Sequence, residues 1–184
     1  MILPIVRDPR LVSMRRGGTL TEPDHQLLAV WAAACAEHVL PLFEESNRGD
    51  SRPREAIEAA RAWARGQATM MHTRAIGGHA MGAARPLRGA ARFAAYAAGQ
   101  AACVAHVPEH DLGASAYSIK AVQSAAPREK EQEAGQAERD WQRRRIPDIL
   151  RDLVLEDQTL TRWPHPPGVR SSPSCIIILT GTVV

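Results

Sequence analysis

The 184-residue chain has few aromatic residues, few cysteines and almost no lysine. Aromatic side chains make up 4% of the residues, and valine and isoleucine are sparse, whereas alanine is abundant. Strands are enriched in β-branched and aromatic residues, whereas alanine is the strongest helix former. The composition therefore excludes a sheet-rich fold and predicts an all-α protein whose helices pack closely through small side chains.

The three cysteines, Cys35, Cys103 and Cys175, cannot form an even disulfide framework. Two of them lie in apolar helical contexts, which indicates a reducing cytoplasm. No segment approaches the roughly 20 apolar residues that a membrane span needs. The short apolar run at the N-terminus is interrupted by Pro4 and Arg7 before it reaches signal-peptide length. We therefore expect a cytoplasmic protein without a membrane partner.

Lysine occurs only at Lys120 and Lys130, so 21 of the 23 basic residues are arginine (23 − 2). The net charge is +3, and residues 1–20 alone carry four arginines against Asp8, which is also +3 (4 − 1). The remainder is balanced, whereas nucleic-acid binding usually needs a clustered basic face. Nucleic-acid binding is therefore a weak hypothesis for this chain, and we rank it third, after the binding and hydrolase functions described below.

The densest helical pattern runs over residues 21–46. Thr21 predicts an N-cap with Asp24 returning a hydrogen bond to it. Apolar residues then recur at intervals of three and four, which is typical of a helix buried along one face; these are Leu28, Trp31, Cys35, Val39 and Leu42, widened by Leu27, Ala34, His38 and Phe43. Pro41 lacks an N–H, so a kink or stop is expected near Leu40.

Six further helices are predicted. Five of them are marked by residues typical of a helix start: Ser51 with Pro53, the N-cap Thr69, Pro86, Pro108 and Pro147. The sixth is the polar stretch over residues 128–145. We expect a single orthogonal bundle of six to seven short helices. The expected organisation is an irregular lead-in over 1–20, a helical domain over 21–160 and a Pro- and Ile-rich tail over 161–184 that is disordered or aberrant.

Two constellations could hold zinc. Residues 106–110 spell H-x-x-E-H, but Pro108 interrupts the single helix that this motif requires and leaves His106 in a turn. The second constellation is a four-ligand set, Cys35 and His38 with Cys103 and His106, whose separation matches no common zinc module. Buried cysteines more often behave as small hydrophobes. We therefore expect no metal and no cofactor.

A zinc-dependent helical hydrolase is nevertheless the main alternative function. It would use His38, His79, His106 and His110 with nearby acids. No G-x-S-x-G, Walker, Rossmann or paired-carboxylate pattern accompanies these histidines. The residues alone therefore favour no enzyme class.

Several ordered segments resemble a bacterial family of immunity proteins from polymorphic toxin systems. The segments are RDPR at 7–10, RRGGTL at 15–20, WAAACAEHVL at 31–40, RPR at 52–54, AARAWARG at 59–66, GHAMGAAR at 78–85 and AHV at 105–107. The resemblance covers about residues 5–160, and its strength lies in the order of the segments. After Arg162 the chain departs from the family pattern.

The resemblance implies an all-α, non-enzymatic protein that binds and neutralises one cognate toxin through a stoichiometric protein–protein contact. No catalytic residue is carried over from the family. The family positions that could form the recognition surface or pocket are Trp31, Glu37, His38, Arg52, Arg61, His79, Arg85 and His106.

Overall fold

The computed structural model describes residues 8–160. It confirms the all-α prediction, because these residues contain eight α-helices, four short 3₁₀ helices and no strand. The α-helices are α1 (Glu22–Val39), α2 (Pro41–Glu44), α3 (Arg52–Ala64), α4 (Met70–Ala84), α5 (Gly89–Cys103), α6 (His110–Ala125), α7 (Glu131–Arg143) and α8 (Arg151–Leu160). The 3₁₀ helices are η1 (Pro9–Leu11), η2 (Met14–Arg16), η3 (Arg128–Lys130) and η4 (Asp148–Leu150). The predicted tail over 161–184, including Cys175, lies outside the described residues.

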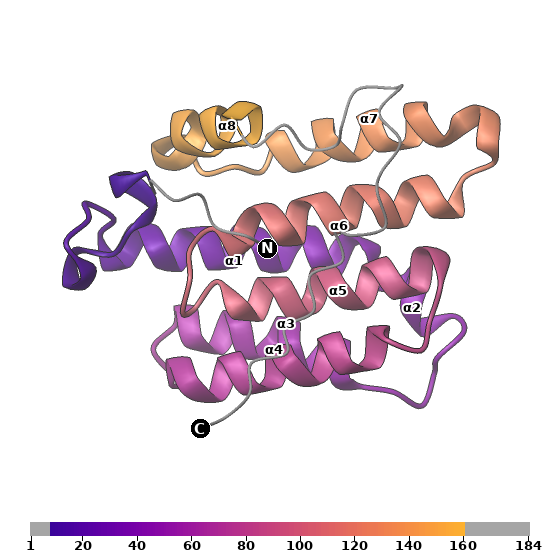
Figure 1. Cartoon of the computed structure of the whole chain (residues 1–184), viewed down its shortest axis with the longest axis horizontal. Coiled ribbons are helices and arrows are strands. Elements are labelled where there is room, and N and C mark those ends of the chain that lie inside the picture. Colours follow the sequence, from indigo (N-terminus) through magenta and orange to yellow (C-terminus); the bar gives the residue numbers. More distant parts are fainter. Residues whose placement is uncertain (1–7, 161–184) are drawn as a thin grey trace.

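Helix α5 is the central element of the bundle. It packs against α4 and α6 along its length and also contacts α1, α2 and α3. In Figure 1, the longer helices run along the long axis of the molecule, with α7 and α8 along one edge and α3 and α4 along the other. None of the described helices has the length and apolarity that a membrane crossing requires.

The close approach of α4 and α5 confirms that small side chains form the core. Six alanines of α5 are completely buried. A methyl group added at Gly77 of α4 would lie 2.8 Å from the carbonyl oxygen of Gly99 and 3.1 Å from the Cβ of Ala102 on α5. Glycine at position 77 is therefore what allows the two backbones to come this close.

The predicted start and end of the first helix are confirmed. The Thr21 hydroxyl accepts a hydrogen bond from the Asp24 amide at 3.2 Å. The Asp24 carboxylate, however, accepts from the Thr21 hydroxyl at 2.6 Å instead of from the cap's backbone N–H. At the other end, α1 stops at Val39, and Pro41 opens the four-residue α2, whose Phe43 is completely buried.

The prediction that Pro86 lies in the first turn of a helix is wrong. Helix α5 begins three residues later, at Gly89. The amide of Leu87 donates to the carbonyl of Ala84, which closes the end of α4, and Arg88 is fully extended at φ −134° and ψ 166°. An extended residue cannot propagate a helix, so the new helix has to nucleate after it.

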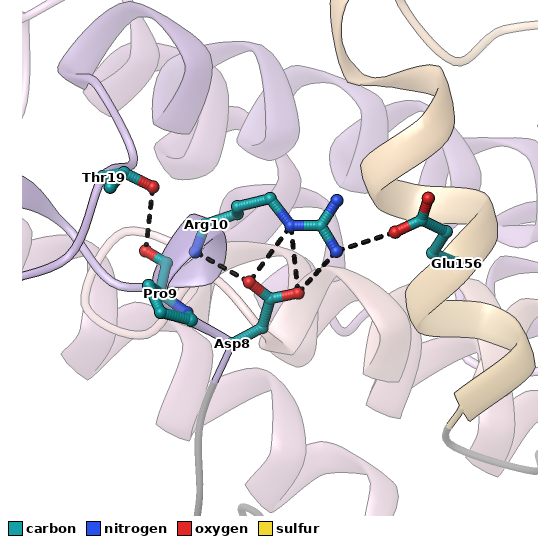
Figure 2. A network of polar contacts seen from close by, with 5 residues as sticks. All are labelled: Asp8, Pro9, Arg10, Thr19 and Glu156. Atoms are coloured by element: carbon teal, nitrogen blue, oxygen red, sulfur yellow. Dashed lines mark hydrogen bonds and ion pairs between the residues drawn. The ribbon is translucent and has the colours of Figure 1, made fainter.

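The lead-in folds onto the bundle through buried leucines and an ion-pair network. Leu11 and Leu20 are buried in the hydrophobic core. Figure 2 shows Arg10 between Asp8 and Glu156 of α8, with 2.7 Å from its Nη2 to a carboxylate oxygen of each. Residues 8–20 are thereby tied to the last helix.

Candidate binding surface

A solvent-facing stripe runs along α1 on the side opposite its buried face. We call it the outer α1 stripe and define it as Leu27, Val30, Ala34, Glu37 and His38. Leu27 is 36% exposed and Val30 45% exposed, although both are aliphatic. The prediction that Leu27 and His38 widen the buried stripe is wrong, since helical spacing places them on the face away from the core.

Glu37 links the outer α1 stripe to α3. Its two carboxylate oxygens accept from Nη1 and Nη2 of Arg61 at 2.6 Å each, a bidentate pair that fixes both side chains. The hydrogen bonds to Arg61 lower the pKa of Glu37, so the carboxylate is charged at neutral pH. Two of the predicted family positions are therefore joined at the α3 side of the stripe.

His38 links the stripe to α7 through an aromatic stack. Its ring lies parallel to that of Trp141, with 3.7 Å between centroids and 4° between planes. The guanidinium carbon of Arg145 lies 3.8 Å from the same Trp141 centroid. Because the imidazole already covers one face of the indole, the guanidinium occupies the other, and the three groups form a continuous stack.

A buried hydrogen-bond network holds His38 in this stack. His38 Nδ1 donates to Oε2 of Glu138 at 2.7 Å, and Gln142 Nε2 donates to the other carboxylate oxygen at 2.8 Å. Gln142 in turn accepts from the Ser115 hydroxyl of α6 at 2.6 Å and donates to the Ser115 carbonyl at 3.2 Å. The network connects the core of the α6–α7 pair to the surface of α1.

Trp31 is not part of this surface. It is 2% exposed, and its Nε1 donates to the Gln142 carbonyl at 3.1 Å, so it packs in the core between α1 and α7. The prediction that Trp31 could lie on the recognition surface is therefore wrong. The helical spacing that exposes Val30 and Glu37 turns position 31 toward the core.

The remaining predicted positions are not gathered on the stripe. Arg52 is exposed at the start of α3 and bonds to Asp50. His79 is exposed on α4, and Arg85 is exposed at the end of that helix. A shallow hollow of about 360 Å³ lies between Glu44, Asp50 and Arg54. These side chains are already in ion pairs, Glu44 with Arg54 and Asp50 with Arg52.

The structure gathers three of the five residues considered as metal ligands. Cys103, His106 and His110 each offer a ligand atom, and these atoms lie within 4.8 Å of one another at the turn from α5 to α6. Cys35 is completely buried elsewhere on α1, and His38 is bonded to Glu138. The predicted four-ligand set is therefore not assembled among the described residues.

Sequence reasoning missed Val30, Trp141 and Arg145 as parts of the surface. The signal for Val30 was the apolar character of the outer face of α1, where helical spacing aligns positions 27, 30, 34 and 37. Trp141 was the one large apolar residue in the polar stretch over 128–145. No signal in the sequence pairs it with His38, because that contact depends on how α7 packs.

Comparison with known proteins identifies the family. The model of the family described as "Imm-5 like putative immunity protein" matches residues 18–149, which include all of α1 through α7. The chain belongs to this family. Neither the curated proteins nor the solved structures contain a match to the chain.

Proposed function

We propose that the chain is an immunity protein that binds one cognate bacterial toxin in the cytoplasm, and that the outer α1 stripe with Arg61, Trp141 and Arg145 is its recognition surface. The observation that carries the proposal is the family match, which spans the helices that build this surface. Binding alone is the proposed activity, and no step of catalysis is assigned to the chain.

The chemistry of the stripe suits a protein partner. Two exposed aliphatic side chains, Leu27 and Val30, form an apolar patch on the N-terminal half of α1. The Glu37–Arg61 pair and the His38–Trp141–Arg145 stack add charge and aromatic surface at the C-terminal end of the same helix. Tryptophan and arginine are the residue types enriched among those that dominate binding energy at protein interfaces. The bidentate pair and the stack are also fixed before binding, which lowers the entropy lost on association.

The alternative functions have weaker support. A hydrolase built on four histidines would need them together, but His38 lies on α1 and His79 on α4, away from the pair at the α5–α6 turn. Nucleic-acid binding would need a clustered basic face, whereas the outer α1 stripe combines two exposed aliphatic side chains with a carboxylate that is paired to Arg61. The described surface is therefore better suited to a protein than to phosphate groups.

The proposal is tested by co-expressing the chain with the toxin encoded beside its gene and measuring growth, together with titration calorimetry of the purified pair. Val30→Asp is the main variant, because it places a charge in the apolar patch of Leu27 and Val30 on the exposed face of α1 without altering a core residue. We expect a 1:1 complex, lost or weakened at least tenfold by Val30→Asp. Arg85→Ala on α4 is the matched control and should bind like the wild type.

Three results would each contradict a part of the proposal. If the chain neither binds the toxin nor restores growth, the immunity role fails for that partner. If Val30→Asp binds normally and Arg85→Ala does not, the role stands and the recognition surface lies on α4. Retention of nucleic acid that falls steeply with salt would instead favour the third hypothesis.

A further inference from the structure

The turn from α5 to α6 brings together three side chains whose donor atoms suit a transition metal. Cys103 is the last residue of α5, His106 lies in the turn and His110 is the first residue of α6. Their ligand atoms lie within 4.8 Å of one another. The spacing is C-x₂-H-x₃-H, and the non-helical residues 104–109 place the second histidine close to the first.

Both imidazoles are held in the tautomer that leaves the lone pair on Nε2. His106 Nδ1 donates to the Cys103 carbonyl at 2.8 Å, and His110 Nδ1 donates to Oε1 of Gln100 at 2.8 Å. A neutral imidazole whose Nδ1 carries the hydrogen has its lone pair on Nε2. Histidine ligands in metal sites nearly always donate their second ring N–H to a carbonyl or carboxylate in this way.

A transition metal binds the thiolate of cysteine and the neutral imidazole of histidine, so binding at this cluster releases the thiol proton of Cys103.

Two glycines leave room around the three side chains. A methyl group added at Gly113 of α6 would collide with the carboxamide of Gln100, which orients His110. A methyl group at Gly77 of α4 would lie 3.1 Å from Cys103 Sγ. Glycine at positions 113 and 77 therefore leaves the space that the Gln100 carboxamide and the Cys103 sulfur occupy.

From this arrangement we infer that Cys103, His106 and His110 bind one Zn²⁺ ion. Zinc takes a mixed set of thiolate and imidazole ligands with tetrahedral geometry, in which neighbouring donor atoms are about 3.3–3.6 Å apart given Zn–S and Zn–N bonds of about 2.3 and 2.0–2.1 Å. The three donor atoms lie within 4.8 Å of one another, so the side chains have to rotate toward the ion to reach that spacing. They occupy three positions of the tetrahedron, and water takes the fourth.

The bound ion joins the end of α5 to the start of α6 across the turn. Since α5 and α6 are the central neighbours of the bundle, the ion stabilises the folded chain against unfolding. This inference does not rest on toxin binding, because none of the three ligands belongs to the outer α1 stripe.

The test uses the full chain, purified through a tag that does not bind metal and in buffers without chelator. Elemental analysis and native mass spectrometry should find one zinc per chain, and the melting temperature should fall when zinc is removed by a chelator. Replacing zinc with Co²⁺ should produce the thiolate-to-cobalt charge-transfer band and the intense visible bands of a tetrahedral site. Absence of zinc after titration with excess Zn²⁺, or a cobalt spectrum without the thiolate band, would overturn the inference.

Variants identify the ligands. Cys103→Ser should abolish the charge-transfer band, and His110→Gln should release the metal, whereas His79→Gln on the exposed face of α4 is the control that should bind as the wild type does. Gln100→Leu keeps every ligand and removes only the group that orients His110, so it should weaken zinc binding about 10–100-fold. If Cys103→Ser fails to fold, the zinc affinity of Gln100→Leu decides whether the site is assigned correctly. Unchanged affinity in Gln100→Leu, or a thiolate band that persists in Cys103→Ser, would refute the assignment.

Discussion

The buried side chain of Gln142 gives the sharpest test of how the bundle supports its surface. Gln142 is completely buried on α7, and its carboxamide makes three hydrogen bonds, two to Ser115 and one to Glu138. The substitution Gln142→Leu keeps a side chain of similar size and removes all three. Its backbone carbonyl remains available to Trp31, so the packing of α1 is not directly disturbed.

The expected loss of stability follows from these bonds. Two hydrogen bonds between neutral groups contribute about 1 kcal/mol each, and the bond to the Glu138 carboxylate contributes about 1.5–3 kcal/mol. Burying leucine in place of a carboxamide returns part of this, about 1–2 kcal/mol. The free energy of unfolding should therefore fall by about 3 kcal/mol, which lowers the melting temperature of a domain of this size by about 6–12 °C.

The measurement is urea unfolding followed by circular dichroism, with Gln136→Leu as the control. Gln136 lies on the exposed face of the same helix, where it bonds only to other surface side chains. The identical substitution there should change the free energy of unfolding by no more than about 0.5 kcal/mol. A difference between the two variants thus isolates the buried network from helix propensity.

A double-mutant cycle with Ser115→Ala checks the reasoning independently. Without Gln142 the Ser115 hydroxyl loses its acceptor, so removing both groups should cost less than the sum of the single changes by about 1 kcal/mol or more. A loss below 1 kcal/mol for Gln142→Leu, or strictly additive losses in the cycle, would show that the network does not hold α6 and α7 together.

Three further predictions concern the core and its response to pH. Trp31→Ala should lower the free energy of unfolding by about 3–5 kcal/mol in a denaturant titration, and unchanged stability would contradict its buried position. Gly77→Ala should cost about 1–3 kcal/mol by the same measurement, because the added methyl group meets α5. Burial lowers the pKa of His25, against the opposing charges of Glu109 and Glu22, so its contribution to stability is complete above about pH 6.5 and is lost as the pH falls toward its lowered pKa. Stability measured between pH 7.5 and 5.5 should fall more steeply in the wild type than in His25→Gln, by at most about 1.4 kcal/mol per pH unit, and equal slopes would refute this role.

The fold was predictable because its signals are local. Alanine content, the cap at Thr21 and the stop at Pro41 each act within one helical turn, and the structure follows them. Pro86 shows the limit of such signals. Proline is compatible with a first helical turn and equally with the turn that closes the preceding helix, and the Leu87–Ala84 hydrogen bond selects the second.

The surface was only partly predictable because it depends on contacts between helices. Glu37, His38 and Arg61 were found as family positions, but nothing in the sequence specifies that one pairs with α3 and the next stacks on α7. A helix advances about 100° per residue, so neighbours along the chain can face different partners. The same geometry explains why Trp31 is buried although it lies within the same family motif.

The cysteine–histidine cluster shows how a local argument can be correct in its step and still miss the outcome. The chain is not helical over residues 104–109, and His106 lies in this turn, as expected. Within a helix, two histidines four residues apart meet on one face only when the helix is continuous, so the H-x-x-E-H spacing alone does not predict that they meet here. A tight turn between packed antiparallel helices is a second way to bring them together, and here it also adds the residue that ends the first helix. Cys103 and His110 meet because α5 and α6 pack side by side, which is a property of the bundle and not of any segment within it.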